Sequence, residues 1–122
     1  MATLLVALGG AAGSAGRYWT GVLFAGAFGL EFPLGTLIIN VLGSFIIGLA
    51  DVAAGANTTR LLVIVGFCGG YTTFSSFSLQ TLELIRGGHP VDASLNVVLS
   101  VALCLAATIA GASVGASLRA AL

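Results

Sequence analysis

Four long apolar stretches, each about long enough to cross a lipid bilayer, limit the possible folds of this chain more than any other feature. They run from about residue 3 to 28, 34 to 50, 61 to 85 and 94 to 118. A helix needs about 20 mostly apolar residues to cross the hydrocarbon core, where every backbone polar group must be paired. The sequence therefore predicts an all-α membrane protein with four transmembrane helices in one domain, residues 1–122.

The low charge content supports a lipid environment. Only 7% of the 122 residues are charged, whereas ordinary soluble chains carry about 25%. The net charge is zero and no run of like charges occurs, so we expect a lipid bilayer around the protein and no nucleic-acid partner. No basic residue precedes Arg17. The first stretch therefore lacks the positive flank of a cleaved signal peptide, and we expect it to be retained.

The connections between the stretches are short and rich in turn-forming residues, as in 29–33, 51–60 and 86–92. Short connections make neighbouring helices run antiparallel. The termini and the second connection should therefore lie on one side of the membrane, with the first and third connections on the other.

The four arginines do not indicate an orientation. Arg60 and Arg119 fall on the side of the termini, and Arg86 and Arg17 fall towards the other. An excess of basic residues on the cytoplasmic side usually sets orientation, and here it is missing. Either another cue orients the chain, or copies insert both ways and pair as an antiparallel, dual-topology homodimer. We favour the second hypothesis because such a dimer would bury more helix surface.

Glycines four residues apart occur in three of the stretches. This spacing places small residues on one helix face, where backbones can approach closely. The pairs predict a tightly packed bundle: Gly9 and Gly13, Gly66 and Gly70, Gly111 and Gly115.

Arg17 lies inside the first stretch, eleven residues before Phe28. A buried arginine costs about 2.5–3.5 kcal/mol on insertion scales, so an ionisable residue within a span suggests a function. Two roles stay open for Arg17. It could line a water-filled vestibule that attracts anions, or it could pair with the end of another helix.

The third stretch contains a predicted helix break. Gly69 and Gly70 are followed by the hydroxyl residues Thr72 and Thr73. Glycine tolerates unusual φ and ψ, and Thr or Ser side chains compete for backbone hydrogen bonds, so we expect non-helical backbone within 69–73. Freed carbonyl oxygens in discontinuous membrane helices often hold Na⁺. If two antiparallel copies met here, a monovalent cation would be the natural occupant.

An amide and two aromatic rings accompany this break. Asn40 lies in the middle of the second stretch, where its amide must face another helix or an aqueous path. Phe74 and Phe77 are three residues apart and so share a helix face. Aromatic rings have positive edges, which can face a small anion, and uncharged donors bind an anion weakly enough for release.

Three strings of residues resemble the Fluc (CrcB) family of fluoride channels. The longest is Gly69-Gly70-x-Thr72-Thr73-Phe74-Ser75-Ser76-Phe77-Ser78, and the others are Pro33-x-Gly35-Thr36-x3-Asn40-x2-Gly43 and Arg17-Tyr18 after the glycine-rich segment 9–16.

This resemblance implies a protein of the bacterial plasma or inner membrane that passively exports fluoride. It implies an antiparallel homodimer with two fluoride pores and one structural Na⁺ at its interface. By similarity, the main-chain carbonyls of Gly69 and Thr72 would bind Na⁺. The pore residues would be Asn40, Phe74, Phe77, Ser75, Ser76 and Thr108. Many relatives carry a tyrosine near the position of Asn96 or Val97, which this chain lacks.

Two other classes of membrane protein compete with the channel interpretation. A proton-coupled small multidrug exporter needs a carboxylate within a span, but Asp51 and Glu83 lie at the ends of stretches and Glu31 and Asp92 lie in connections. A purely structural membrane subunit would fit the composition and would leave Asn40 beside the break unexplained. We expect no enzyme, because the single histidine, His89, has no catalytic partner that the sequence identifies.

The two cysteines, Cys68 and Cys104, both lie inside apolar stretches. Their spacing fits neither a disulfide framework nor a metal site, so we expect them to be packing residues.

Overall fold

The computed structural model describes residues 1–28 and 32–121, and for residues 25–28 it describes the backbone alone. Every regular element in these ranges is helical. The elements are α1 (Ala2–Phe28), α2 (Leu34–Ala53), α3 (Asn57–Thr59), the π-helix η1 (Arg60–Cys68), α4 (Gly69–Tyr71), α5 (Phe74–Arg86) and α6 (Pro90–Ala121). The chain therefore has the predicted all-helical fold, and the third stretch is divided into several pieces. Glu31 lies outside the described residues.

Three helical segments in the described part of the chain are long and apolar enough to cross a membrane. They are Leu34–Ala53, Asn57–Arg86 and Pro90–Ala121. Helix α1 has 27 residues, which corresponds to about 40 Å at 1.5 Å per residue. That length exceeds the hydrocarbon core of about 30 Å.

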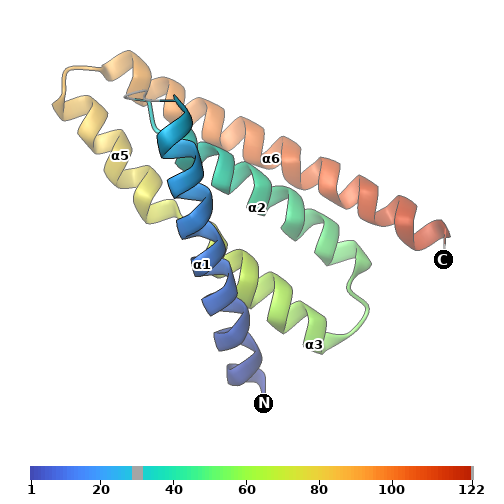
Figure 1. Ribbon diagram of the computed structural model, residues 1–122. Coiled ribbons are helices and arrows are strands. Elements are labelled where there is room, and N and C mark those ends of the chain that lie inside the picture. The colour runs from blue at the N-terminus through green and yellow to red at the C-terminus, as the bar shows by residue number, and fades with distance from the viewer. Residues whose placement is uncertain (29–31, 122) are drawn as a thin grey trace.

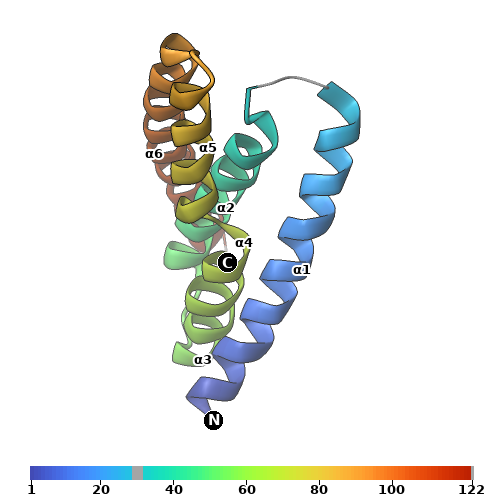
Figure 2. The same cartoon turned by 90° about the vertical axis from the view of Figure 1, so that its left-hand side faces the viewer.

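The helices form two packed groups that meet at the break. Helices α2 and α6 run side by side and in the same direction, and α5 lies next to the first part of α6 (Figure 1). Helix α1 crosses on the other side of the molecule and packs on η1 and α4 (Figure 2). The α5–α6 turn lies at one end of the molecule, and both termini lie towards the opposite end (Figure 1).

Glycines make the contact between α1 and the first part of the third stretch. A Cβ atom added at Gly9 would overlap the carbonyl oxygen of Leu62, and one added at Gly13 would overlap that of Phe67. A Cβ added at Gly70 would in turn overlap the carbonyl oxygen of Gly10. The two helices therefore touch backbone to backbone, as the four-residue glycine spacing predicted.

The contact between α2 and α6 is built in the same way. A Cβ at Gly48 would overlap the carbonyl oxygen of Thr108, and one at Gly111 would overlap that of Phe45. A Cβ at Gly115 would lie 2.8 Å from Leu49 O. All three glycine pairs singled out in the sequence thus lie at close helix contacts.

The break is shorter than predicted. Gly69 is helical, with φ −61° and ψ −37°, and α4 continues through Gly70 to Tyr71. Only Thr72 (φ −80°, ψ 157°) and Thr73 (φ −149°, ψ 107°) are extended. The expectation that the glycine pair itself would leave the helix was wrong. Gly70 packs closely against Gly10, whereas a Cβ at Gly69 would meet nothing within 4 Å. The hydroxyl residues Thr72 and Thr73 form the break.

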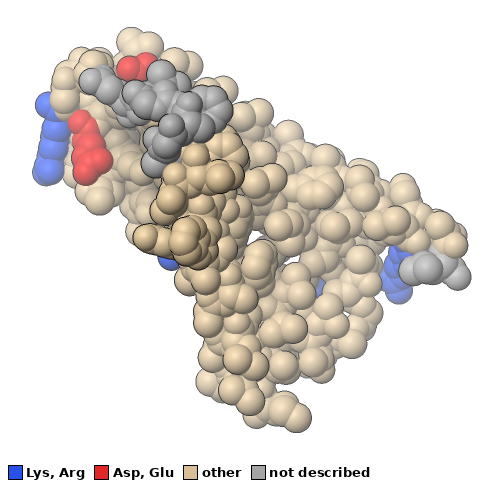
Figure 3. Space-filling view, in the orientation of Figure 1, with Lys and Arg blue, Asp and Glu red and all other residues tan. Residues whose placement is uncertain are grey.

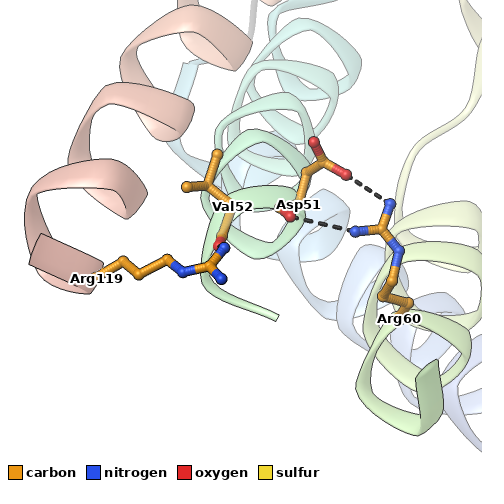
Figure 4. Close-up of polar contacts among 4 residues, drawn as sticks. All are labelled: Asp51, Val52, Arg60 and Arg119. Carbon is orange, nitrogen blue, oxygen red and sulfur yellow. Dashed lines mark hydrogen bonds and ion pairs between the residues drawn. The ribbon is translucent and has the colours of Figure 1, made fainter. Parts of the chain in front are cut away.

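Two arginines meet the C-terminal end of α2 (Figure 4). Arg60 donates from Nη2 to Asp51 Oδ1 at 2.7 Å and from Nη1 to Asp51 O at 3.2 Å. Arg119 donates to Val52 O at 3.4 Å. Carbonyls in the last turn of a helix lack intrahelical donors and carry partial negative charge, so cations stabilise this end.

Charged side chains gather near the ends of the helices. Acidic and basic groups lie together where α5 ends and α6 begins, and most of the visible surface between the two ends is uncharged (Figure 3). This distribution suits a molecule whose middle faces hydrocarbon.

Candidate functional site

The side chain of Asn40 pairs with the main chain of the break. Its Nδ2 donates to Thr73 O at 3.1 Å, and its Oδ1 accepts from Thr73 N at 2.8 Å. The amide thus satisfies both backbone groups of a residue that is in neither helix. An unpaired backbone group in hydrocarbon costs several kcal/mol, so Asn40 on α2 stabilises the break in the neighbouring segment.

The side chain of Thr73 caps the N-terminus of the next helix, α5. Its Oγ1 accepts from Ser76 N at 3.1 Å, which is the standard hydrogen bond of a helix N-cap. The same oxygen donates to Ser76 Oγ at 3.0 Å and lies 3.3 Å from Ser75 Oγ. The hydroxyl groups after the break therefore form one connected network.

These side-chain bonds replace two main-chain bonds of a continuous helix. In such a helix the N–H of Thr73 would donate to Gly69 O, and the N–H of Ser76 would donate to Thr72 O. Here Thr73 N donates to Asn40 Oδ1, and Ser76 N donates to Thr73 Oγ1. The carbonyls of Gly69 and Thr72 thereby lose their usual donors, and these are the two carbonyls predicted to face a cation.

A pocket of about 490 Å³ lies beside the break. It is bounded by α2, the end of η1, the break, the start of α5 and the middle of α6. Its lining residues are Asn40, Gly43, Ser44, Ile47, Ile64, Cys68, Gly69, Thr72, Thr73, Phe74, Phe77, Ser100, Val101, Cys104 and Leu105. The walls are mainly apolar, and a few amide, hydroxyl and thiol groups interrupt them.

Both predicted aromatic residues line this pocket. The ring centroids of Phe74 and Phe77 are 5.2 Å apart, and the ring planes are tilted by 50°. Phe74 is 79% exposed in the single chain, whereas Phe77 is half-buried. In a chain that spans a membrane, an exposed apolar ring faces lipid or another protein surface.

The other predicted pore residues, Ser75, Ser76 and Thr108, do not line the pocket. Ser75 and Ser76 hold the hydroxyl network around Thr73. Thr108 donates its hydroxyl to Cys104 O at 3.0 Å and contacts α2 through its backbone. Among the described residues, the pocket lining contains Asn40, Phe74 and Phe77 from the predicted pore set but none of these three hydroxyl residues.

Arg17 lies on α1, away from the pocket lining, and is half-buried. No described residue accepts a hydrogen bond from its guanidinium or forms an ion pair with it. Its two predicted roles, in a vestibule or in a pairing with a helix end, both stay predictions. The neighbouring Tyr18 and Trp19 are exposed and contact each other edge to face, with centroids 5.5 Å apart.

A polar row on α6 was not predicted from the sequence. Asn96, Ser100, Cys104 and Thr108 recur every four residues, so they lie along one helix face. Ser100 and Cys104 line the pocket. Asn96 is only 2% exposed and donates to Thr81 Oγ1 at 2.9 Å, which links α6 to α5. The four-residue spacing of these polar residues was the pattern that could have identified Ser100.

The fold and site define a class of protein. Non-helical backbone at the depth of a membrane occurs where protein buries it or where it lines a polar cavity, as in channels and transporters. The chain matches the family described as "CrcB-like protein, Camphor Resistance (CrcB)" over residues 4–122, and it belongs to this family.

Relatives with similar sequences share one name. A "Fluoride-specific ion channel FluC" from Rhodospirillum rubrum is 51% identical over 107 residues, which cover 82% of this chain and 83% of the relative. Proteins of the same name are 46% identical in Methylocella silvestris (80% and 79% covered) and 44% identical in Coxiella burnetii strain Dugway 5J108-111 (82% and 86% covered). The chain is thus a multi-pass membrane protein of a bacterial ion-channel family and not an enzyme.

Proposed function

We propose that this chain forms a fluoride-selective channel through which fluoride leaves the cytoplasm passively. The observation that carries the proposal is the similarity to relatives named fluoride-specific ion channels over about four fifths of the chain. The pocket at the break supports it, because amide, hydroxyl and aromatic groups meet there.

The chemistry of the pocket suits a small anion that must both bind and leave. The amide of Asn40 has two N–H bonds; one of them donates to Thr73 O, so the second is available to an ion. No arginine or lysine occurs in the lining, within the described residues. Uncharged donors and the positive edges of Phe74 and Phe77 would replace the water around the ion without trapping it.

The assembly that we propose is an antiparallel, dual-topology homodimer with two pores. Phe74 is highly exposed in the single chain, and a Cβ built on Gly69 would meet nothing within 4 Å. A second copy placed against this surface would cover the ring and the break together. The even distribution of arginines between the two sides also supports insertion in both directions.

A Na⁺ ion at the centre of the dimer is part of this proposal. The carbonyls of Gly69 and Thr72 lack the donors that a continuous helix would give them. Na⁺ is a hard cation, and the freed carbonyls of broken membrane helices are suitable ligands for it. One chain supplies two such oxygens and its copy would supply two more, so the residues present fit this ion. Its role would be to hold the two breaks together.

A flux assay tests the channel directly. The purified protein in liposomes, under an outward gradient of fluoride, should release fluoride, whereas an equal gradient of chloride should produce no release above empty liposomes. Phe77→Ile should reduce the fluoride rate without loss of folded protein, and Leu79→Ile, an exposed position on the same helix, serves as its matched control. Equal release of both anions would refute the proposal.

A second assay tests the assembly. A tag at the C-terminus should be accessible from both faces of the membrane in intact cells or oriented vesicles. Accessibility from one face alone would refute dual topology and leave the channel proposal standing. Replacing Na⁺ by a large organic cation should weaken the dimer, which is measurable by the dilution at which monomers appear.

A further inference from the structure

Two cysteines line the pocket from different elements. Cys68 is the last residue of η1 and is 2% exposed, and Cys104 lies in the middle of α6 and is half-buried. Both are free thiols. The sequence suggested packing roles for them, but the structure places both at the wall of the pocket that contains Asn40 and Phe77.

Cys104 differs from its neighbours in the polar row of α6 in the chemistry of its side chain. One turn before it, Ser100 also lines the pocket; one turn after it, Thr108 donates to the Cys104 carbonyl. The neighbours in the row thus offer hydroxyl oxygens, whereas Cys104 offers a thiol, which is a weaker hydrogen-bond donor and a far better nucleophile. The wall of the pocket therefore contains a nucleophilic side chain.

We propose that this pocket is a site of covalent thiol modification. A small neutral thiosulfonate would form a mixed disulfide with Cys104, and more slowly with the better-buried Cys68, and would thereby close the fluoride path. The inference rests on the proposed function as a fluoride channel for its effect on flux. The modification itself depends only on the pocket and its thiols.

The chemistry is balanced and needs no further oxidant. The Cys104 thiol gives its proton to water, and the thiolate sulfur attacks the sulfenyl sulfur of methyl methanethiosulfonate. A new S–S bond forms, the bond between the sulfenyl and sulfonyl sulfurs breaks, and methanesulfinate leaves with the electron pair. The protein retains an –S–CH₃ group, which dithiothreitol removes by thiol–disulfide exchange.

The added group would occupy space in the pocket that Phe77 also lines. Conduction requires a continuous series of weak sites, so filling one of them stops passage even when the rest are intact. The difference in burial between the two cysteines predicts the order of reaction, because a reagent reaches the more exposed thiol first.

The experiment uses the full chain in liposomes, treated with methyl methanethiosulfonate. Intact-mass spectrometry counts the adducts, and fluoride release is compared before and after treatment. Fluoride release should fall by about an order of magnitude as the first adduct forms and should recover with dithiothreitol. The variants Cys104→Ser, Cys68→Ser and the double variant are each compared with their own untreated rate. Cys104→Ser should lose most of the sensitivity to the reagent, whereas Cys68→Ser should keep it.

Three results would overturn the proposal: an adduct on Cys104 with unchanged flux, an absence of adducts on the folded protein, or a Cys104→Ser variant that is blocked as fully as the parent. A protein that releases no fluoride before treatment would refute the channel function instead. In that case the adduct count on Cys104 still decides whether the modification site exists.

Discussion

The two parts of the third stretch, before and after the break, are held in place by different interactions. The first part, η1 with α4, packs on α1 through glycines that bring the backbones into contact. The second part, α5, is tied to its neighbours by side-chain hydrogen bonds, from Asn40 at its start and from Asn96 further along.

The first part therefore fixes the position of the third stretch, whereas the second part carries residues of the pocket. Backbone contact at glycines leaves little freedom, because any added atom overlaps the partner helix. Hydrogen bonds from single side chains hold the start of α5 while Phe74 and Phe77 stay at the pocket. We therefore expect substitutions in the first part to affect folding, and substitutions around the second part to affect the pocket as well.

The largest effect is expected from Gly13→Leu. A Cβ at Gly13 would overlap Phe67 O and lie 2.8 Å from Tyr71 N, so the added side chain would push α1 away from the third stretch. Overpacking that cannot relax belongs to the rare substitutions that cost more than about 4 kcal/mol. Denaturant titration in detergent should show loss of the folded protein. The matched control is Gly21→Ala on the same helix, whose Cβ would meet nothing within 4 Å. Equal stability of the two variants would contradict the anchoring role of the glycine contact.

The next largest effect is expected from Asn40→Ala. The change leaves both the N–H and the C=O of Thr73 unpaired, and a buried group left unsatisfied costs about 1–3 kcal/mol. We expect the free energy of unfolding to fall and fluoride flux to be lost. Hydrogen exchange at the Thr73 amide should accelerate.

Ser44→Ala is its matched control, because Ser44 lines the same pocket one turn further along α2. If Asn40→Ala left the exchange of the Thr73 amide unchanged, the amide of Asn40 would not be the group that holds the break.

A smaller effect is expected from Asn96→Ala. Asn96 is buried and donates to Thr81 Oγ1, so the change removes one side-chain hydrogen bond between α5 and α6 and leaves a small cavity. Its cost should be about 1–2 kcal/mol in the free energy of unfolding, measured by the same titration. Ser94→Ala, at an exposed position in α6, should be neutral. A cost equal to that of Asn40→Ala would show that α5 depends on α6 as much as on α2.

The smallest effect is expected from Arg60→Gln at the start of η1. The ion pair of Arg60 with Asp51 is largely exposed, with 46% and 60% of the two side chains accessible. Exposed pairs contribute about 0–1 kcal/mol. The variant should unfold within about 1 kcal/mol of the parent, and added salt should reduce the difference. A larger, salt-independent loss would indicate that this end of the third stretch is also an anchor.

Much of the fold could be predicted from the sequence because its pattern is strong. Apolar stretches of membrane length, turn residues between them and glycines four apart have direct structural meaning. The break was also predictable, but its limits were not. Both glycines are helical, and Gly70 is in close contact with Gly10, a tertiary contact that the local sequence does not reveal.

The site was predicted less completely than the fold. Asn40, Phe74 and Phe77 could be chosen because polar or paired aromatic residues stand out in apolar surroundings. The partner of Asn40 could not be predicted, because Asn40 bonds to the backbone of Thr73 and a backbone group leaves no pattern in the sequence. Thr108 was named through the family resemblance alone; its hydroxyl donates to Cys104 O in its own helix, and its role in a pore stays a prediction.

The π-helix η1 also determines how deep the break lies. Its hydrogen bonds reach back five residues instead of four, which places more residues in each turn and shortens the segment along its axis. Nine residues in this form carry the chain less far across the bilayer than nine residues of α-helix. Thr72 and Thr73 therefore lie nearer the α3 end than a residue count would suggest. Removing one residue from η1 to restore α-helical pitch would move the break relative to the lipid surface.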